Sequence, residues 1–369
     1  MLEKMNNKEF NRDLPYNTIP DLPPKANLET AEIFRATIRA NKLLAELKGF
    51  CQTLPNPELL LNTIVLQESK ESSAIENIVT TQDELYKATL MGDRVKNQAA
   101  KEVLQYRQAM YYGIDELKKN GLITPNLLVG IMQKLRNSAD GIRRNLGTKL
   151  LNPTTGQVVY TPPEGEEVIQ QKLFALAQFI NAPEDDNLDP LVKMALIHYQ
   201  FEAIHPFSDG NGRTGRILNI LYLIQQSLIG LPVLYLSKYI IENKTDYYRL
   251  LREVTEQNNW NEWVLYVVNG IAETSATTLE KVKRILLLKS EAGDDLKSKL
   301  GLSFSRELND LLFSYPYIKI SVLEEHGIAK RQTASRYLKE IEKAGWLMSV
   351  QIWKETYYIN YKLINILSS

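Results

Sequence analysis

The chain has 369 residues, which is enough for two or three domains with hydrophobic cores of their own. Its 44 basic residues balance 44 acidic ones, so bulk charge predicts neither a nucleic-acid partner nor a membrane partner. A single cysteine, Cys51, excludes an internal disulfide, and with three histidines beside it no structural zinc cluster is expected. Because no apolar run is long enough to span a membrane and residues 1–24 lack the apolar core of a signal peptide, we expect a cytoplasmic protein.

The first third of the chain is predicted to be an extended arm followed by helices. Four prolines among residues 1–27 favour an arm that lies on the body of the protein. From Leu28 onward, apolar residues recur at helical spacing. Three further helices are expected, over residues 57–67, 83–119 and 124–136.

Residues 141–163 break this helical pattern. Two β-prone runs, 148–151 and 158–161, flank the turn-forming string Asn-Pro-Thr-Thr-Gly at 152–156. Prolines, glycines and asparagines in this arrangement are typical of hairpin turns. The sequence therefore predicts a β-hairpin here, followed by a return to helix at 166–181.

The densest cluster of chemically active side chains is His-Pro-Phe-Ser-Asp-Gly-Asn-Gly-Arg-Thr-Gly-Arg, at residues 205–216. It lies between two apolar runs, 191–203 and 217–228, that predict buried helices. The motif is therefore a short loop that ends at a helix N-terminus, where free N–H groups and the helix dipole favour an anion. Glycines in the motif let that backbone approach a phosphate closely, since no Cβ is in the way.

The charged side chains of this motif suit a nucleotide phosphate site. Arg213 and Arg216 lie three residues apart, so on a helix they share a face and can grip two phosphoryl groups. Asp209 suits Mg²⁺, which takes few protein carboxylates and completes its shell with phosphate oxygens and water. His205 is the natural general base at neutral pH.

The alternative is a glycine-rich turn between two helices, with surface arginines and an incidental histidine. That interpretation does not explain why all these groups fall within one short loop. A Walker A loop is a poor match, because no Gly-Lys-Ser/Thr follows the glycines and a helix, not a strand, precedes them. His198, on the apolar stripe of the preceding helix, is expected to be a core histidine and not a ligand.

Helical patterns continue after the motif and then give way to a different module. Helices are expected over residues 236–243, 246–257, 260–288, 308–313, 320–325 and 331–344. A charged linker is expected at 289–303, and the alternating run 346–358 predicts a β-hairpin. Three helices followed by a hairpin resemble a winged helix, with residues 330–344 as its candidate recognition helix. Nine basic against seven acidic residues in 301–369 are a weak footprint for DNA, so a protein-binding or dimer-supporting role stands beside DNA binding.

The motif at 205–216 resembles the signature of the Fic-domain family, HxFx[D/E]GNGRxxR, at every fixed position. The resemblance implies transfer of AMP from ATP to a tyrosine, threonine or serine hydroxyl of a target protein and of the enzyme itself, with pyrophosphate released. It implies that His205 is the base, that Asp209 is the Mg²⁺ ligand, and that Arg213 and Arg216 hold the β- and γ-phosphates. The anion site for the α- and β-phosphates would be lined by Gly210, Asn211 and Gly212.

Further upstream, residues 72–77 (Ser-Ser-Ala-Ile-Glu-Asn) resemble the inhibitory pattern of this family, [S/T]xxxE[G/N]. Ser72, Glu76 and Asn77 stand at its fixed positions. A carboxylate that reaches Arg216 would form a charge-assisted pair where the γ-phosphate belongs, and would repel that phosphate. The alternative is a capped surface helix with Glu76 in solvent.

The resemblance also implies that the predicted hairpin is a flap over the active site. It would hold a segment of the target by strand addition, along Val158, Val159 and Tyr160. The alternative is a plain surface hairpin. Tyr247 and Tyr248 are candidates for one wall of an adenine pocket by stacking, with packing in the core as the alternative.

The sequence thus predicts a mostly α-helical Fic-type bundle with a hairpin flap and a small winged-helix domain. The expected divisions are an N-terminal arm with the inhibitory segment (1–80), a catalytic domain (81–288) and the winged helix (301–369). Expected partners are ATP with Mg²⁺, a target protein, and a second copy of the chain in a homodimer. Two rivals are a Fic enzyme that removes AMP or uses another nucleotide, and a DNA-binding regulator whose helical body senses a nucleotide.

Overall fold

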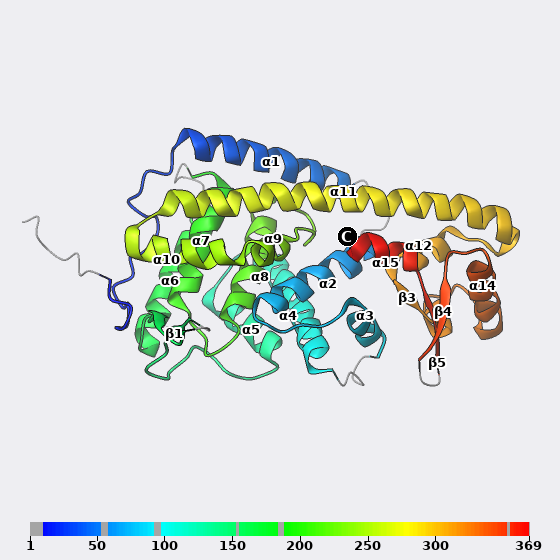
Figure 1. Cartoon of the computed structure of the whole chain (residues 1–369), viewed down its shortest axis with the longest axis horizontal. Coiled ribbons are helices and arrows are strands. Elements are labelled where there is room, and N and C mark those ends of the chain that lie inside the picture. The colour runs from blue at the N-terminus through cyan, green and yellow to red at the C-terminus, as the bar shows by residue number, and fades with distance from the viewer. Residues whose placement is uncertain are drawn as a thin grey trace, which may run out of the picture. The chain divides into compact units, whose positions relative to one another are not determined.

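The computed structural model describes residues 10–52, 58–91, 97–152, 155–183, 188–352 and 355–368. Part of the predicted hairpin turn, at 153–154, lies outside the described residues. The helices are α1 (Ala31–Gln52), α2 (Glu58–Ile75), α3 (Gln82–Met91), α4 (Gln98–Asn120), α5 (Pro125–Arg136), α6 (Glu166–Asn181), α7 (Pro190–Ile204), α8 (Asn211–Gln225), α9 (Leu236–Glu242), α10 (Lys244–Gln257), α11 (Trp260–Leu300), α12 (Arg306–Ser314), α13 (Ile320–Glu325), α14 (Arg331–Lys343) and α15 (Tyr361–Ser368) (Figure 1). The strands are β1 (Leu150–Leu151), β2 (Val158–Tyr160), β3 (Tyr317–Ile318), β4 (Met348–Ile352) and β5 (Glu355–Ile359). The mostly α-helical fold with short strands is confirmed.

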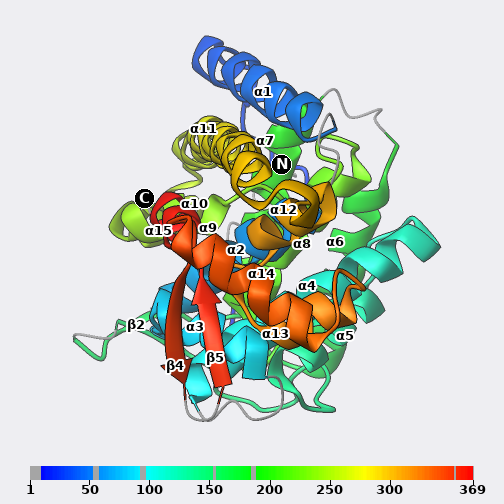
Figure 2. The ribbon, with the colours of Figure 1, turned by 90° about the vertical axis from the view of Figure 1, so that its right-hand side faces the viewer.

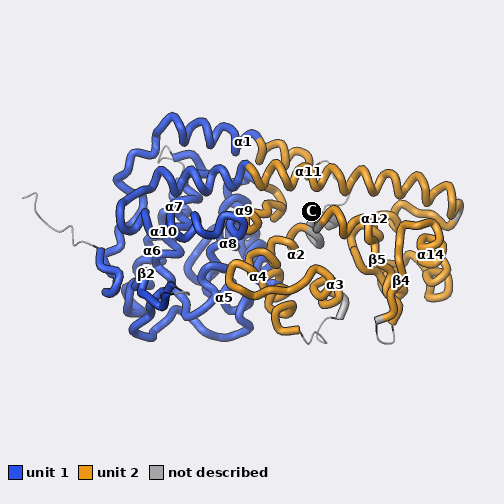
Figure 3. Tube along the Cα trace, viewed as in Figure 1, with its two compact units in different colours: residues 1–42, 108–228, 239–272 blue, residues 43–107, 229–238, 273–369 orange. Residues whose placement is uncertain are grey.

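The chain divides into two compact units, which Figure 3 colours separately. Unit 1 comprises residues 1–42, 108–228 and 239–272, and unit 2 comprises 43–107, 229–238 and 273–369. These units differ from the three consecutive domains expected from the sequence, because α1, α4 and α11 each contribute residues to both.

In unit 1, the helices before and after the motif form the centre of the bundle. Helix α7 packs against α6 and α8, and α5 packs against α8. Asp189 caps α7 by accepting a hydrogen bond from the Leu191 N–H at 2.8 Å, and Pro190 occupies the first turn. Side chains around the whole circumference of α7 are buried, as expected for a helix that is apolar on all sides. The motif therefore emerges from the rigid core of the unit.

The C-terminal part of unit 2 has the helix and strand order of a winged helix. Helices α12, α13 and α14 accompany a three-stranded sheet of order β3-β5-β4, and β4 and β5 form the predicted hairpin (Figure 2). Helix α12 also packs against α2, and the two share one hydrophobic cluster that includes Ile64, Leu308 and Leu312. The module is therefore continuous with the core of unit 2.

The prediction of a linker at 289–303 was wrong for most of that range. Helix α11 continues to Leu300, and a short 3₁₀ turn at Gly301–Ser303 follows it. Ala292 and Leu296, four residues apart, are fully buried in the core of unit 2. Because these two side chains are buried, the segment is helical, although its charged composition had predicted a linker.

Across the described part of the chain, no helix combines the length and the apolar character that crossing a membrane requires.

Candidate active site

The motif loop is held in shape by its own backbone and by Asn211. Helix α7 ends at His205, whose left-handed conformation (φ 50°, ψ 57°) turns the chain while its N–H donates to the Phe201 carbonyl at 3.1 Å. Gly210, also at positive φ (85°), precedes the first residue of α8. The Asn211 side chain accepts from the Phe207 N–H at 2.8 Å and donates to the Phe207 carbonyl at 2.7 Å. Asn211 thus closes the loop with its side chain, and the first N–H groups of α8 lie at the end of that loop.

The close approach of α7 and α8 behind this loop depends on Gly215. A Cβ at this position would lie 2.6 Å from Glu202 Oε1 and 3.0 Å from the Phe201 ring. Phe207, from the motif, is fully buried, with its ring centroid 6.2 Å from that of Phe201. The third glycine of the motif therefore serves helix packing.

Arg143 clamps the His205 turn from a segment 62 residues earlier in the chain. Its Nε donates to the His205 carbonyl at 2.8 Å, and its backbone N–H donates to the Pro206 carbonyl at 2.9 Å. A terminal guanidinium nitrogen donates to the Pro163 carbonyl, on the far side of the hairpin. Arg143 is buried, which lowers the pKa of its guanidinium. This role of Arg143 was not predicted from the sequence.

The two arginines of the motif are buried, whereas its aspartate is open to solvent. Arg213 and Arg216 are 2% and 3% exposed, and the Asp209 side chain is 54% exposed. Asp209 forms an ion pair with Arg136 at 2.5 Å and lies 3.6 Å from the Arg213 guanidinium. Arg136, in the last turn of α5, was not predicted from the sequence. An exposed carboxylate beside a helix N-terminus fits Mg²⁺, which binds through one or two carboxylates and fills its shell from substrate and water.

His198 is a core histidine, as predicted. It is 1% exposed, its Nε2 lies 2.9 Å from the Tyr247 hydroxyl, and its ring stacks on Trp263. Burial, followed by the positive charge of Arg216, lowers its pKa to about 3. His198 is therefore neutral at physiological pH.

Lowering the pH from 7 to 5 is expected to destabilise the protein through His198. The unfolded chain takes up a proton near pH 6.5, whereas the folded protein, with a pKa of about 3, does not. The stability that this depressed pKa contributes is present above pH 6.5 and is lost as the pH falls, by about 2 kcal/mol at pH 5. Urea unfolding at both pH values measures the loss, and His198→Gln should show a correspondingly flatter pH dependence. Equal pH dependence in the two proteins would contradict the assignment.

The two tyrosines proposed for an adenine pocket differ in exposure. Tyr247 is fully buried, and its hydroxyl is engaged with His198. Tyr248 is 48% exposed, with its ring at 76° to that of Tyr247. Tyr247 therefore packs in the core, and Tyr248 is the more exposed of the two.

The predicted hairpin is present, and its tyrosine ties it to the motif helix. Strands β1 and β2 pair antiparallel, with Leu150 opposite Tyr160. The Tyr160 hydroxyl donates to the Ala203 carbonyl at 2.9 Å, two residues before His205. The arm at the N-terminus lies against this side of the hairpin, as expected: Phe10 stacks on Tyr160, and the Tyr16 N–H donates to the Thr161 carbonyl at 3.0 Å. Tyr160 therefore anchors the hairpin, while Val158 and Val159 remain candidates for contact with a target.

The inhibitory pattern lies in unit 2, at the C-terminal end of α2. Ser72 is fully buried in the last turn, and Glu76 is exposed immediately after it. Asn77 adopts the left-handed conformation (φ 63°), its N–H donates to the Ala74 carbonyl, and the Ile78 N–H donates to the Ser73 carbonyl, both at 3.0 Å. This is a Schellman helix end, which favours glycine or asparagine at the left-handed position. The left-handed backbone at the end of α2 thus explains the asparagine at the last position of the pattern. The pairing of Glu76 with Arg216 stays a prediction.

Comparison with known proteins agrees with this arrangement. Three family models match: the Fic/DOC family N-terminal region over residues 34–115, the Fic/DOC family over 122–223, and the C-terminal domain of SoFic-like protein adenylyltransferase over 287–363. The protein adenylyltransferase fic-1 of Caenorhabditis elegans is 32% identical over 108 residues, which are 29% of this chain and 20% of that protein. A probable protein adenylyltransferase of Aquifex aeolicus is 29% identical over 195 residues, 50% of this chain and 55% of that one. The chain thus spans between 20% and 55% of the length of these relatives.

Solved structures share the fold. A Fic family protein from Desulfovibrio desulfuricans aligns with a TM-score of 0.59 and 20% identity, covering 92% of this chain and 98% of that one. Fic-1 from Caenorhabditis elegans aligns with a TM-score of 0.52 and 20% identity, covering 68% of this chain and 74% of that one. The three family models, which together match residues 34–115, 122–223 and 287–363, show that the chain belongs to the Fic/DOC family.

Proposed function

We propose that this protein is a protein adenylyltransferase that transfers AMP from ATP to a tyrosine, threonine or serine hydroxyl of a target protein and of itself. The observation that carries the proposal is the loop between α7 and α8. There, a clamped histidine precedes a helix N-terminus beside two buried arginines. The names of the relatives support the same activity.

The loop offers a separate group for each part of the reaction. Backbone N–H groups at Gly210, Asn211 and Gly212 would receive the α- and β-phosphates, because they end the loop at the positive end of the α8 dipole. Arg213 would hold the β-phosphate and Arg216 the γ-phosphate, since a buried guanidinium makes strong bonds to phosphate oxygens.

His205 would act as the general base. Its Nδ1 is buried, which leaves Nε2 as the ring nitrogen that can reach a substrate hydroxyl. As that nitrogen takes the hydroxyl proton, the oxygen bonds to the α-phosphorus, the bond from that phosphorus to the bridging oxygen breaks, and pyrophosphate leaves. Asp209 would hold Mg²⁺, which, when bound, offsets phosphate charge.

Inhibition by Glu76 is the regulatory part of the proposal. Glu76 extends from the capped end of α2, where Asn77 turns the chain. An ion pair between this carboxylate and Arg216 would compete with the γ-phosphate for the same guanidinium. ATP would then bind with its α-phosphorus out of line for attack.

Radiolabelled ATP tests the activity directly. Purified protein is incubated with ATP labelled at the α- or the γ-phosphate, and label on protein is counted after denaturation. Label from the α-position supports AMP transfer, whereas label from the γ-position indicates phosphate transfer. Loss of label when ATP is withdrawn indicates AMP removal. No label from either position, with tight binding to duplex DNA, would favour the nucleotide-sensing regulator, for which the winged helix would supply the contact.

Asp209→Ala is expected to abolish the Mg²⁺-dependent part of transfer and the tightening of ATP binding by Mg²⁺. The ion takes few protein ligands, so losing its one motif carboxylate leaves it without an anchor. Transfer rates and calorimetric ATP titrations across a range of Mg²⁺ concentrations measure both effects. Asp115→Ala, which removes an exposed carboxylate from α4 in the same unit, is the control. Unchanged Mg²⁺ dependence in Asp209→Ala would contradict the assignment.

Arg143→Lys is expected to lower the rate of transfer by about 10²-fold with little change in ATP affinity. Lysine keeps the charge but lacks the guanidinium geometry that bonds the His205 and Pro163 carbonyls at the same time. Without both bonds His205 would be slightly misplaced, and a small displacement of a reacting group lowers the rate by about this factor. Steady-state kcat and KM for ATP separate the two effects. The neighbouring Arg144→Lys is the control, because Arg144 is exposed and pairs with Glu166 at 2.8 Å. A raised KM with an unchanged kcat would show that Arg143 acts on binding instead.

A further inference from the structure

Unit 2 contains a cavity that belongs to none of the motifs described so far. It lies between α2, the start of α9 and the middle of α11, and its volume is about 210 Å³. The lining residues are Ile64, Gln67, Tyr235, Lys238, Thr277, Thr278, Glu280, Lys281 and Arg284. At about 30 Å³ for each water, this volume corresponds to roughly seven water molecules, more than a single ion requires.

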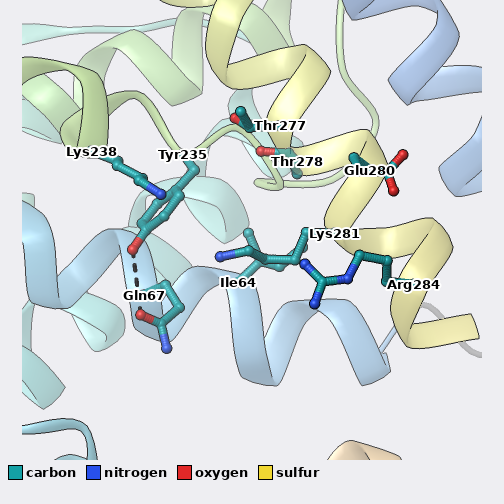
Figure 4. A pocket seen from close by; sticks show the side chains of 9 residues that line it. All are labelled: Ile64, Gln67, Tyr235, Lys238, Thr277, Thr278, Glu280, Lys281 and Arg284. Carbon is teal, nitrogen blue, oxygen red and sulfur yellow. Dashed lines mark hydrogen bonds between the residues drawn. The ribbon is translucent and has the colours of Figure 1, made fainter. Parts of the chain in front are cut away.

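Positive charge dominates the lining. Figure 4 shows Lys238, Lys281 and Arg284 directed toward the space beside Tyr235, whereas the Glu280 carboxylate points away. Burial, followed by the charges of Lys238 and Arg284, lowers the pKa of Lys281 to about 8. The positive charges of Lys238 on α9 and Arg284 on α11 therefore lie close enough to Lys281 to lower its pKa.

Lys281 retains donors for a ligand. Its Nζ donates to the Leu367 carbonyl at 3.2 Å and lies 5.6 Å from the centre of the Tyr235 ring. An ammonium group has three N–H donors, so this bond leaves two. Glu71, on α2, pairs with Lys70 at 3.3 Å and accepts from the Tyr235 hydroxyl at 3.4 Å.

Thr278 supplies a second, independent indication of a ligand. The residue is 3% exposed, lines the cavity, and its hydroxyl oxygen has no hydrogen-bond partner within the described part of the chain. Buried hydroxyls are nearly always paired, because an unpaired one loses its bonds to water without replacement. The oxygen has almost no accessible surface, so a rotation about the Cα–Cβ bond of Thr278 would present it to a ligand oxygen in the cavity.

We propose that this cavity binds a small phosphorylated anion, with its phosphate oxygens bonded to Lys281, Arg284 and Thr278. A phosphate accepts several bonds at once from ammonium, guanidinium and hydroxyl groups. Ile64 offers an apolar side for a small organic substituent, and Gln67 offers an amide. The inference does not rest on the proposed function, because every lining residue belongs to unit 2 and the GNGR motif belongs to unit 1. Since α2 carries both Ile64 and Ser72, a bound anion would stabilise the helix that ends in the inhibitory pattern.

Protection of Lys281 from acetylation tests the site in the full-length protein. The protein is titrated with inorganic pyrophosphate, with glycerol phosphate in a parallel arm, and treated with an amine-acetylating reagent; peptides are quantified by mass spectrometry. Acetylation of Lys281 is expected to fall saturably, while that of Lys283 stays constant. Lys283 lies on the same helix, outside the cavity, and pairs with Glu46 at 3.3 Å. Chloride at matched ionic strength controls for screening. A constant Lys281 rate at every concentration of both probes would overturn the proposal.

Three variants separate binding from general effects of charge. Arg284→Gln is expected to weaken the protection of Lys281 by about tenfold or more, because it removes a charge-assisted bond. Thr278→Val, which keeps the shape of the side chain, should also weaken protection without lowering the unfolding midpoint. Lys283→Gln makes the same charge change outside the cavity and should leave protection unchanged. Equal dissociation constants for Arg284→Gln and Lys283→Gln would show that the phosphate senses only the overall charge of α11.

Discussion

Replacing His205 with alanine is expected to lower the rate of AMP transfer by about 10²–10⁴-fold, with ATP affinity nearly unchanged. The hydroxyl of the target is a weak nucleophile until its proton is taken up, and no other side chain of the motif is a plausible base. The groups proposed to bind ATP are the α8 N-terminus and the buried arginines, and His205 is not among them. Transfer of α-label and calorimetric titration of ATP measure the two quantities separately.

The control for this experiment is another histidine. His326 directly follows α13 in unit 2, is exposed, and has its Nδ1 2.9 Å from the Val322 carbonyl. His326→Ala should transfer AMP at the rate of the unmodified protein. Substantial residual transfer by His205→Ala would contradict the proposed role of the motif histidine, whatever the control shows.

Replacing Glu76 with glycine is expected to raise auto-modification and target modification by about 10²-fold. If the carboxylate pairs with Arg216, its removal releases that guanidinium for the γ-phosphate, and the α-phosphorus moves into line for attack. Initial rates of α-label incorporation, for the enzyme alone and with a lysate as the source of targets, measure the gain. An unchanged rate in Glu76→Gly would end the inhibition hypothesis.

Two controls separate the carboxylate from the helix end that carries it. Asn77→Gly keeps the left-handed turn, since glycine favours that conformation, and so should not activate. Glu76→Gln keeps the length of the side chain but removes its charge, and should activate. Activation by Asn77→Gly equal to that by Glu76→Gly would point to loosening of α2, and not to loss of the ion pair.

A double mutant tests whether the two residues act through one contact. Arg216→Ala removes the partner of the γ-phosphate together with that of Glu76, so it should not activate. Glu76→Gly/Arg216→Ala should then behave like Arg216→Ala alone. An additive gain in the double mutant would show that Glu76 acts through another group.

Several features of this protein were determined by short stretches of sequence. The motif at 205–216 predicted a loop at a helix N-terminus, and its backbone follows from left-handed residues at His205 and Gly210. Helix α5 begins where the sequence predicted, and Thr124 caps it by accepting from the Leu127 N–H at 3.2 Å. The hairpin strands pair as expected. Each of these depends on hydrogen bonds between residues at most about ten positions apart, and the residue types within that window decide them.

Other features were decided only by the tertiary structure. Arg143 and Arg136 meet the motif from 62 and 73 residues earlier in the chain, at His205 and Asp209 respectively. The segment 289–300, which was expected to be a linker, is the last part of α11 because Ala292 and Leu296 are buried in the core of unit 2. The packing of distant elements decides which carbonyl or carboxylate each arginine contacts. It also decides which charged segment is helical. Periodicity and capping residues are properties of a single helix or strand, so they do not predict which distant residues pack against that element.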